Sequence, residues 1–313
     1  MSGSGPPGWK EVEEALWAKT ERGLRELKGL RKPDVRDVFE RLAYLGPSDF
    51  YITNYHRRFP ISAFNPGAAL EGDKLLIFVR LIFEFYGYIS SVGVTEVRIE
   101  DLMEGRVGQT PLPTRIVLWP RELWEQLGCE DPRVFRTKGR WLVLYCGKGY
   151  YWLEDNMVRT DALALAELDD DFQVLRRGYF SVRRGEALWA PSNRDSAFIR
   201  LEGKEATLVT RPVIRGKKLC WRARADLEAL EMPEEGLEPV MAPEDWESHM
   251  GWSTNVVELS KDEYLVGWHG VSKMDLAYRN GLAVVDAEGR LLAVSDYLLS
   301  PQGLYEEYGD RCM

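Results

Sequence analysis

The sequence predicts an all-β protein built as a β-propeller, with α-helix only near the amino terminus. Helical periodicity fades after residue 49, and four later segments have the alternation and turn residues of β-hairpins. A second strand pair follows at least two of these hairpins, so that a unit of about four strands recurs every 59 to 66 residues. Four-stranded sheets repeated around an axis make a propeller. A β-sandwich whose hairpins happen to be similar is the alternative.

Two helices are expected before the first repeat. Apolar residues at near-helical spacing predict a helix within residues 9–31, and Pro33 ends that pattern. Asp34 could cap a second helix, in which four apolar residues would lie at positions i, i+3, i+4 and i+7. These residues are Val35, Val38, Phe39 and Leu42. We therefore predict an α-helical extension at 1–48 that packs against the propeller or mediates a homo-oligomer, and a propeller domain at 49–313.

The four hairpins share one outline. Each opens on a polar residue, turns at a polar or Gly-containing tip and returns, so that its two ends are 15 residues apart in three cases and 16 in the other. The opening residues are Asn65, Asp131, Asp195 and Thr254, and the closing residues are Arg80, Cys146, Arg211 and His269. In a propeller, the mouths of such hairpins face a common central pocket. We expect these eight residues to converge there and to form the functional site.

Composition excludes several classes of function. The net charge of −9 argues against nucleic acid or an anionic membrane as the main partner. The four cysteines are scattered and no two of the three histidines are close in sequence, so no metal site is expected. Short glycine clusters lack the spacing of nucleotide-binding loops, and we expect no cofactor. The absence of an apolar signal segment or membrane span predicts a cytoplasmic protein with reduced thiols.

An ordered set of motifs resembles one enzyme family. These motifs are "FNPGAA", "GCEDPRV", "SNRDSAFI", "TRP", "GWHGV", "YRNGLAVVD" and "LSPQGLYEEYGD". In this order they resemble glycoside hydrolase family 130, the β-mannoside phosphorylases and related hydrolases, over roughly residues 60 to 310. The resemblance implies a five-bladed β-propeller acting on small β-1,2- or β-1,4-linked mannosides. It also implies inverting phosphorolysis with inorganic phosphate as the nucleophile.

The resemblance assigns roles to individual residues. Asp131 of "EDPR" would be the general acid, protonating the leaving oxygen through a sugar hydroxyl. Arg80, Arg194 and Arg211 would hold the phosphate, which suits the planar, bidentate guanidinium group. His269 and Tyr278 match further motif positions. Each of these residues also has a plainer interpretation as a turn residue, strand end, surface residue or core side chain.

Three other residues are candidates on position. Asn65 could cap a turn or touch a sugar, and Arg133 could pair with Glu130 or contact substrate. Asp195 could form a local ion pair with Arg194, or it could act as the base of a hydrolase. Inverting hydrolysis needs such a second carboxylate, roughly 6.5–9.5 Å from the acid, to activate water.

Two departures from the family pattern keep other functions open. Asp161 or Leu163 stands near the place where the family has an arginine, which weakens the expected phosphate site. The sequence ends at Met313, where the family would begin another axial strand pair. We therefore expect the fifth blade to be incomplete, replaced, or supplied partly by the first 60 residues. Phosphorolysis is the leading interpretation, and phosphate-independent hydrolysis or a catalytically silent propeller that binds a glycan or protein is the alternative.

Overall fold

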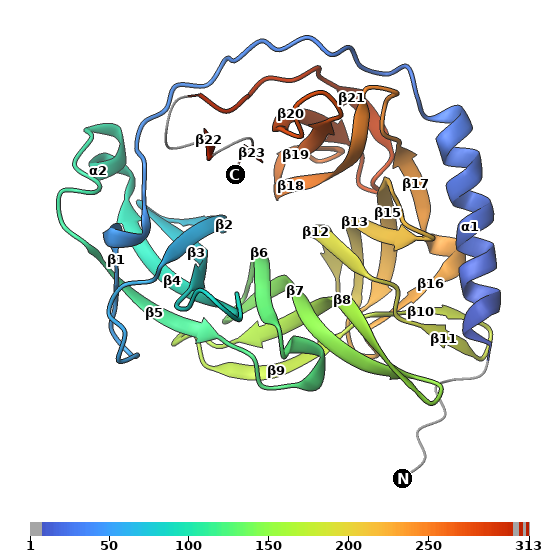
Figure 1. Ribbon diagram of the computed structural model, residues 1–313, viewed down its shortest axis with the longest axis horizontal. Helices are drawn as coiled ribbons and strands as arrows, with labels where there is room; N and C mark the ends of the chain where they lie inside the picture. Colours follow the sequence, from blue (N-terminus) through green and yellow to red (C-terminus); the bar gives the residue numbers. More distant parts are fainter. Residues whose placement is uncertain (1–7, 303–306, 309–310, 313) are drawn as a thin grey trace. The chain divides into compact units, whose positions relative to one another are not determined.

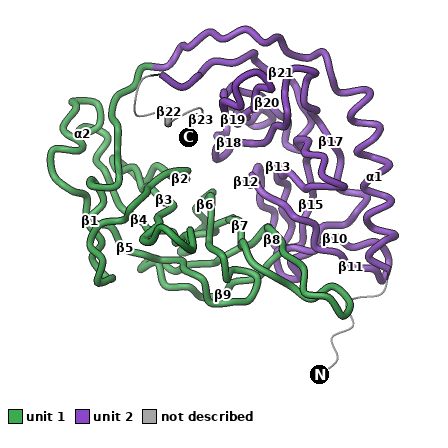
Figure 2. The backbone as a smooth tube through the Cα atoms, in the orientation of Figure 1, with its two compact units in different colours: residues 1–5, 40–179 green, residues 6–39, 180–313 purple. Residues whose placement is uncertain are grey.

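The computed structural model describes residues 8–302, 307–308 and 311–312. The chain divides into two compact units (Figure 2). Unit 1 comprises residues 1–5 and 40–179, and unit 2 comprises residues 6–39 and 180–313. Each unit is described by itself.

Unit 1 contains two antiparallel strand sets (Figure 1). The strands of the first set are β2 (Ser62–Glu71), β3 (Lys74–Ile82), β4 (Ser90–Arg98) and β5 (Leu112–Leu118), with β1 (Phe50–Ile52) parallel to β5. The strands of the second set are β6 (Gly128–Thr137), β7 (Arg140–Leu153), β8 (Asn156–Leu168) and β9 (Val174–Tyr179). Short helices α2 (Ile99–Met103), η1 (Pro47–Asp49) and η2 (Leu123–Glu125) lie in the connections.

A single apolar core joins the two strand sets of unit 1. Phe78 of the first set lies 5.7 Å, between ring centroids, from Trp141 of the second set, and both side chains are buried. The residue pair Ser90 and Gly128 links β4 to β6 in parallel. The residues of this core alternate along their strands, as Leu76 and Phe78 do on β3, while residues of the opposite face, such as Leu81 and Leu144, are also buried.

Unit 2 repeats this plan. Its first strand set contains β12 (Asn193–Glu202), β13 (Glu205–Ile214), β15 (Cys220–Asp226) and β17 (Glu238–Met241). Its second set contains β18 (Glu247–Ser260), β19 (Glu263–Ser272), β20 (Tyr278–Val285) and β21 (Leu291–Val294). The remaining short elements are β10 (Ser181–Arg184), β11 (Ala187–Trp189), β14 (Lys217–Lys218), β16 (Glu231–Pro233), η3 (Glu234–Gly236), β22 (Glu307–Tyr308) and β23 (Arg311–Cys312).

The four hairpins predicted from the sequence are confirmed. They form β2–β3, β6–β7, β12–β13 and β18–β19, and the predicted second pairs form β8–β9 and β20–β21. Four antiparallel strand sets therefore account for the four repeats. The count of five blades stays a prediction, as does the domain boundary after residue 48.

Helix α1 (Trp9–Glu26) packs on unit 2. Its buried residues follow helical spacing and are Val12, Leu16, Thr20 and Gly23. Lys19 lies beside this face, and its Nζ donates hydrogen bonds to the carbonyl oxygens of Glu234 (2.7 Å) and Leu237 (2.8 Å). The sequence-predicted first helix is thus confirmed, and its apolar face is covered by the chain's own strands.

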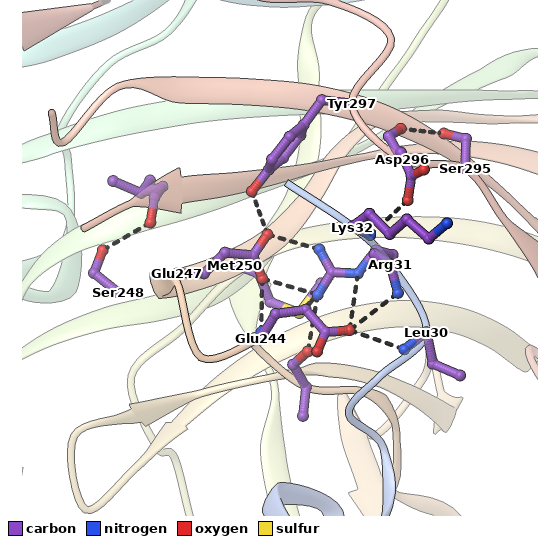
Figure 3. Close-up of polar contacts among 12 residues, drawn as sticks. Leu30, Arg31, Lys32, Glu244, Glu247, Ser248, Met250, Ser295, Asp296 and Tyr297 are labelled. Carbon is purple, nitrogen blue, oxygen red and sulfur yellow. Dashed lines mark hydrogen bonds and ion pairs between the residues drawn. The ribbon is translucent and has the colours of Figure 1, made fainter. Parts of the chain in front are cut away.

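The segment after α1 is anchored in unit 2 by Arg31 (Figure 3). The buried Arg31 guanidinium forms a bidentate ion pair with Glu247, with N–O distances of 2.7 and 2.8 Å, and lies 4.3 Å from the ring centroid of Trp268. The Tyr297 hydroxyl also donates to Glu247. Glu244 accepts hydrogen bonds from three successive backbone N–H groups, those of Gly29, Leu30 and Arg31. Because the Arg31 guanidinium and both carboxylates are paired, the Arg31 side chain can be buried while the residues on either side of it are exposed.

The predicted second helix is wrong. Residues 34–42 are not helical, and their four apolar side chains are exposed. The segment is extended instead: Arg36 N–H donates to the Tyr297 carbonyl (2.9 Å) and Val38 N–H to the Leu298 carbonyl (3.1 Å). These long-range bonds satisfy the backbone that an isolated helical turn would have satisfied locally, so the apolar spacing alone was misleading.

Two further observations concern the described part of the chain. None of its helices is long and apolar enough to cross a membrane. Cys129, Cys146 and Cys220 are buried and form no disulfide bond. Burial raises the pKa of the Cys129 and Cys220 thiols well above the usual value, so these side chains are inert core residues.

Candidate active site

Three of the four hairpin-opening residues adopt the same unusual backbone conformation. Asn65, Asp131 and Asp195 have φ values of 46°, 53° and 53°, each at a register shift in its hairpin. Asn and Asp tolerate this left-handed region better than other non-glycine residues, and a bulge redirects the side chain that it carries. The fourth hairpin also has a register shift around Thr254, but this β-branched residue has no positive φ.

In unit 1, Arg80 connects two carboxylates. Its Nη1 lies 3.0 Å from Oδ1 of Asp131, its Nη2 lies 2.6 Å from Oε1 of Glu130, and its Nε donates to Ser90 Oγ at 2.8 Å. Asn65 Nδ2 donates a second hydrogen bond to Asp131 Oδ1, at 2.9 Å. The sequence-predicted convergence of Asn65, Arg80 and Asp131 is therefore observed within this unit. The two hydrogen bonds fix the orientation of the Asp131 carboxyl group.

Two members of this cluster were missed as site residues. Glu130 is fully buried, and Lys148 of β7 approaches its Oε1 to 3.3 Å beside Arg80. The sequence indicated Glu130 only as a possible partner of Arg133. Arg133 is also buried and its Nη1 donates to the Pro132 carbonyl at 2.8 Å; its contact with substrate stays a prediction. The sequence signal for Lys148 was its position two residues after the hairpin-closing Cys146, which places a cation near the mouth of the hairpin.

The pairing of β7 with β8 shows where Asp161 and Leu163 lie, the residues near the position at which the family has an arginine. Asp161 lies directly opposite Lys148 in the register, while Arg159 lies opposite Tyr150 and is exposed. Leu163 is buried opposite Cys146. A cation is thus present at this level of the strand pair, but on β7 and not at the start of the "ALA" strand.

In unit 2, Asp195, Arg211 and His269 come together as predicted. Arg211 Nε donates to Asp195 Oδ2, and His269 Nε2 lies 3.8 Å from the same oxygen. Ser253 Oγ is 3.0 Å from His269 Nδ1 and donates to Asn280 Oδ1 at 2.9 Å, which orients the imidazole ring from its other side. Neither Ser253 nor Asn280 was predicted. Gly251 packs so closely against Asp195, His269 and Arg211 that a Cβ atom there would collide with the cluster.

Arg211 has a further property. Its Nη1 is buried and has no hydrogen-bond partner among the described residues, and the same holds for Nδ2 of the buried Asn193. Asn193 Oδ1 accepts hydrogen bonds from the Arg211 backbone N–H (3.1 Å) and from Thr210 Oγ1 (2.8 Å), so the Asn193 side chain is bonded to the Arg211 backbone. An unsatisfied buried donor costs free energy, so the Arg211 Nη1 group is available to bind a ligand oxygen.

Tyr278 and Arg194 lie at the edges of the unit 2 cluster. The Tyr278 ring is 5.3 Å, between centroids, from His269 and 6.0 Å from His249. Arg194 is partly exposed and lies opposite Arg211 in the β12–β13 register. Asp195 forms an ion pair with Arg211. Any role of Tyr278 and Arg194 in binding stays a prediction.

His249 is held uncharged near neutral pH. Burial, followed by the charges of Lys218, Arg211 and His269, lowers its pKa to about 4, against a smaller opposing effect of Asp195. Burial is the largest cause of this lowered pKa, and the nearby Lys218 and Arg211 add to it. Among the described residues, no three His, Cys, Asp or Glu side chains are grouped as metal ligands would be.

The comparisons with known proteins identify the family. The family model of glycoside hydrolase family 130, described as beta-1,4-mannooligosaccharide phosphorylase, matches residues 29–313. The chain belongs to glycoside hydrolase family 130. The family comprises phosphorylases and hydrolases of β-mannosidic linkages, so the chain is a member of an enzyme family. A search of curated proteins gives no significant match.

Solved structures show the same fold. A β-1,2-mannobiose phosphorylase from Listeria innocua, solved with β-1,2-mannobiose, is 16% identical and has a TM-score of 0.60, with 84% of each chain covered. A glycosyl hydrolase from Bacteroides ovatus is 18% identical, with a TM-score of 0.61 over 91% of this chain and 85% of that one. A family 130 protein, from a study of hydrolases that target β-1,2-mannosidic linkages in Candida mannan, is 15% identical, with a TM-score of 0.60 over 91% and 83%. The mostly β chain therefore has the β-propeller-like fold of this family.

Proposed function

We propose that the protein is an inverting β-mannoside phosphorylase. A phosphate oxygen attacks the anomeric carbon of the mannosyl residue, the glycosidic C–O bond breaks, and the leaving oxygen takes a proton that Asp131 supplies. Because attack comes from the opposite face, a β-mannoside gives α-mannose 1-phosphate and a shortened sugar. Asp131 suits this role because Arg80 and Asn65 hold its carboxyl group in one orientation.

The ion pair between Asp195 and Arg211 is the observation that favours phosphorolysis over hydrolysis. Inverting hydrolysis needs a second carboxylate that accepts a proton from water. Asp195, the candidate from its repeat position, instead has one oxygen bonded to the Arg211 guanidinium, and His269 Nε2 lies 3.8 Å from the same oxygen, so we assign Asp195 to positioning Arg211. Arg211 in turn retains a buried donor, Nη1, that can bind a phosphate oxygen.

The relatives support mannosides as substrates. A neighbour in fold is a β-1,2-mannobiose phosphorylase solved with its disaccharide, and the family description names β-1,4-mannooligosaccharides. We therefore propose a small β-mannoside as the ligand and inorganic phosphate as the co-substrate. No other cofactor, no nucleic acid partner and a cytoplasmic location stay predictions. Oligomerisation through the N-terminal segment also stays a prediction.

The first experiment incubates the purified protein with β-1,2- and β-1,4-mannobiose, with and without inorganic phosphate. Product analysis by chromatography should detect mannose 1-phosphate only when phosphate is present. Free mannose released at equal rates without phosphate would indicate a hydrolase instead. Absence of product from either sugar would favour a silent propeller that binds a glycan or a protein.

A matched pair of variants tests the phosphate role of unit 2. Arg211→Lys keeps the charge but removes the free Nη1 donor, and it should raise the KM for phosphate by about tenfold or more while the KM for mannobiose changes little. Arg215→Lys, at an exposed ion pair with Glu13 and Glu14, is the control. An unchanged phosphate KM in Arg211→Lys would remove Arg211 from the phosphate site.

A further inference from the structure

The loop that joins β3 to β4 keeps aromatic side chains at the surface. Residues 83–89 have the sequence "FEFYGYI", and Phe85, Tyr86 and Tyr88 are exposed, Tyr86 fully so. Hydrophobic burial removes most such rings from water, and a group of exposed rings commonly marks a binding surface. The loop begins three residues after Arg80 and ends at Ser90, both of which belong to the Asp131 cluster of unit 1.

Tyr88 lies against this cluster. Its ring centroid is 5.7 Å from Cζ of Arg80, 5.9 Å from Nζ of Lys148 and 6.4 Å from the ring centroid of Phe64. Phe64 itself lies 4.6 Å from Cζ of Arg80. The guanidinium that binds Asp131 therefore has an aromatic ring from β2 and another from the loop beside it. Tyr88 nevertheless remains 48% exposed, so much of its surface is available to a ligand.

The backbone of Tyr88 is strained in a way that places this ring. Its φ is 50°, a left-handed conformation that bulky residues rarely adopt. Such strain persists where surrounding contacts enforce it, and it is concentrated at binding sites. Here the contacts are the two cations and Phe64.

The combination matches the two-sided chemistry of a sugar. A pyranose ring has an apolar face of C–H groups and a rim of hydroxyl groups, so it needs an aromatic surface next to hydrogen-bonding side chains. Tyr88 supplies the aromatic surface. Asn65, Arg80, Asp131 and Lys148 supply donors and acceptors on the same unit.

We propose that Tyr88, carried by the aromatic loop 83–89, is a sugar-stacking residue of the Asp131 site. The inference rests on the proposed function for its choice of ligand. Tyr88 binds the sugar and takes no part in proton transfer. Its loss should therefore weaken binding and raise KM with little change in kcat.

The test measures binding without turnover. Asp131→Asn protein, alone and combined with Tyr88→Ala, Tyr88→Phe or Tyr51→Ala, would be titrated calorimetrically with β-1,2- and β-1,4-mannobiose and with β-1,4-mannotriose. Tyr88→Ala should weaken binding about tenfold, the effect of losing one aromatic contact and its buried area, and Tyr88→Phe should remain within about twofold. Tyr51 is a comparably exposed aromatic on β1, several strands from β2, and its replacement should have no effect.

The outcomes separate this inference from the proposed function. Unchanged affinity in folded Tyr88→Ala protein overturns the inference even if the wild-type protein makes mannose 1-phosphate. If Tyr88→Ala weakens binding but the wild-type protein turns over neither mannobiose, the inference is retained and the proposed phosphorylase activity is overturned. If Tyr88→Ala leaves the affinity unchanged but alters the oligomeric state, measured by light scattering, the loop is a protein contact and the inference is overturned. The inference is also overturned if none of the proteins, including Asp131→Asn alone, binds any of the three sugars.

Discussion

In unit 1, Asp131 is paired with an arginine from the neighbouring strand set, whereas in unit 2 Asp195 is paired with the arginine that closes its own hairpin. Both aspartates have the same backbone conformation at the same place in their hairpins. The difference follows from the closing residue: the Asp131 hairpin closes on Cys146, which is buried and uncharged, so Arg80 must come from the other hairpin.

This difference separates the roles of the two carboxylates. Asp195 is neutralised by a local contact, and its arginine keeps a donor for a ligand. Asp131 depends on how the β2–β3 and β6–β7 hairpins pack, and it shares its arginine with the buried Glu130. The comparison suggests that Asp131 is held for chemistry, while Asp195 serves to position Arg211.

The largest expected effect separates the two aspartates directly. Asp131→Asn should lower kcat by about 10³-fold because it removes the proton donor, whereas Asp195→Asn should lower it by about tenfold or less. Initial rates with saturating mannobiose and phosphate would measure this, with circular dichroism to verify folding. Equal losses in both variants would contradict the division of roles and favour Asp195 as the base of a hydrolase.

The next effect concerns stability in unit 1. Arg80→Ala should reduce the free energy of unfolding by about 3–5 kcal/mol, because it leaves the buried Glu130 with Lys148 as its remaining described cation. Urea denaturation followed by tryptophan fluorescence would measure it. Arg98→Ala, in an exposed ion pair of β4, is the matched control and should change stability by less than about 0.5 kcal/mol. A small effect of Arg80→Ala would mean that water readily reaches Glu130.

Two glycines sharpen the comparison further. A Cβ atom at Gly67 would meet the Pro132 carbonyl, which is backbone, whereas a Cβ atom at Gly251 would first meet side-chain atoms of Asp195, His269 and Arg211. Gly67→Ala should therefore cost about 1–3 kcal/mol of stability. Gly251→Ala should cost less stability but raise the KM for phosphate by displacing Arg211.

Thermal unfolding and phosphate kinetics of both alanine variants would measure these effects. A Gly251→Ala protein with an unchanged KM for phosphate would contradict this prediction, because phosphate binding would then not depend on the position of Arg211.

The smallest effect is a pH dependence that belongs to unit 2. The pKa of His249 is about 4 in the folded protein, against about 6.5 unfolded, so the unfolded chain binds the extra proton between these values. Stability should fall as pH drops from 7 to 5, and His249→Asn should reduce that fall by a few degrees in Tm. Between pH 7 and pH 8 the two proteins should change alike, which is the internal control. An identical fall at pH 5 would show that His249 is accessible to protons when folded.

Local sequence determined the strands and the hairpin register. Alternating apolar residues, the 15-residue spacing and glycine-containing turns were sufficient, because strand direction and turn geometry depend on neighbouring residues. Asn65, Asp131 and Asp195 could also be recognised as hairpin-opening residues. Their side chains are short and polar, and these residue types tolerate the left-handed conformation that the bulges impose.

Tertiary structure decided which side chains meet and which segments remain extended. The repeat pattern predicted that Arg80 and Asp131 would meet, but not that the buried Glu130 would share the Arg80 guanidinium or that Lys148 and Tyr88 would join them, since these contacts cross hairpins and loops. It also predicted a helix where Val35 and Val38 lie in an extended segment, because only the fold supplies the Tyr297 and Leu298 carbonyls that bind this backbone. Contacts between residues far apart in the chain depend on packing, which short-range patterns do not specify.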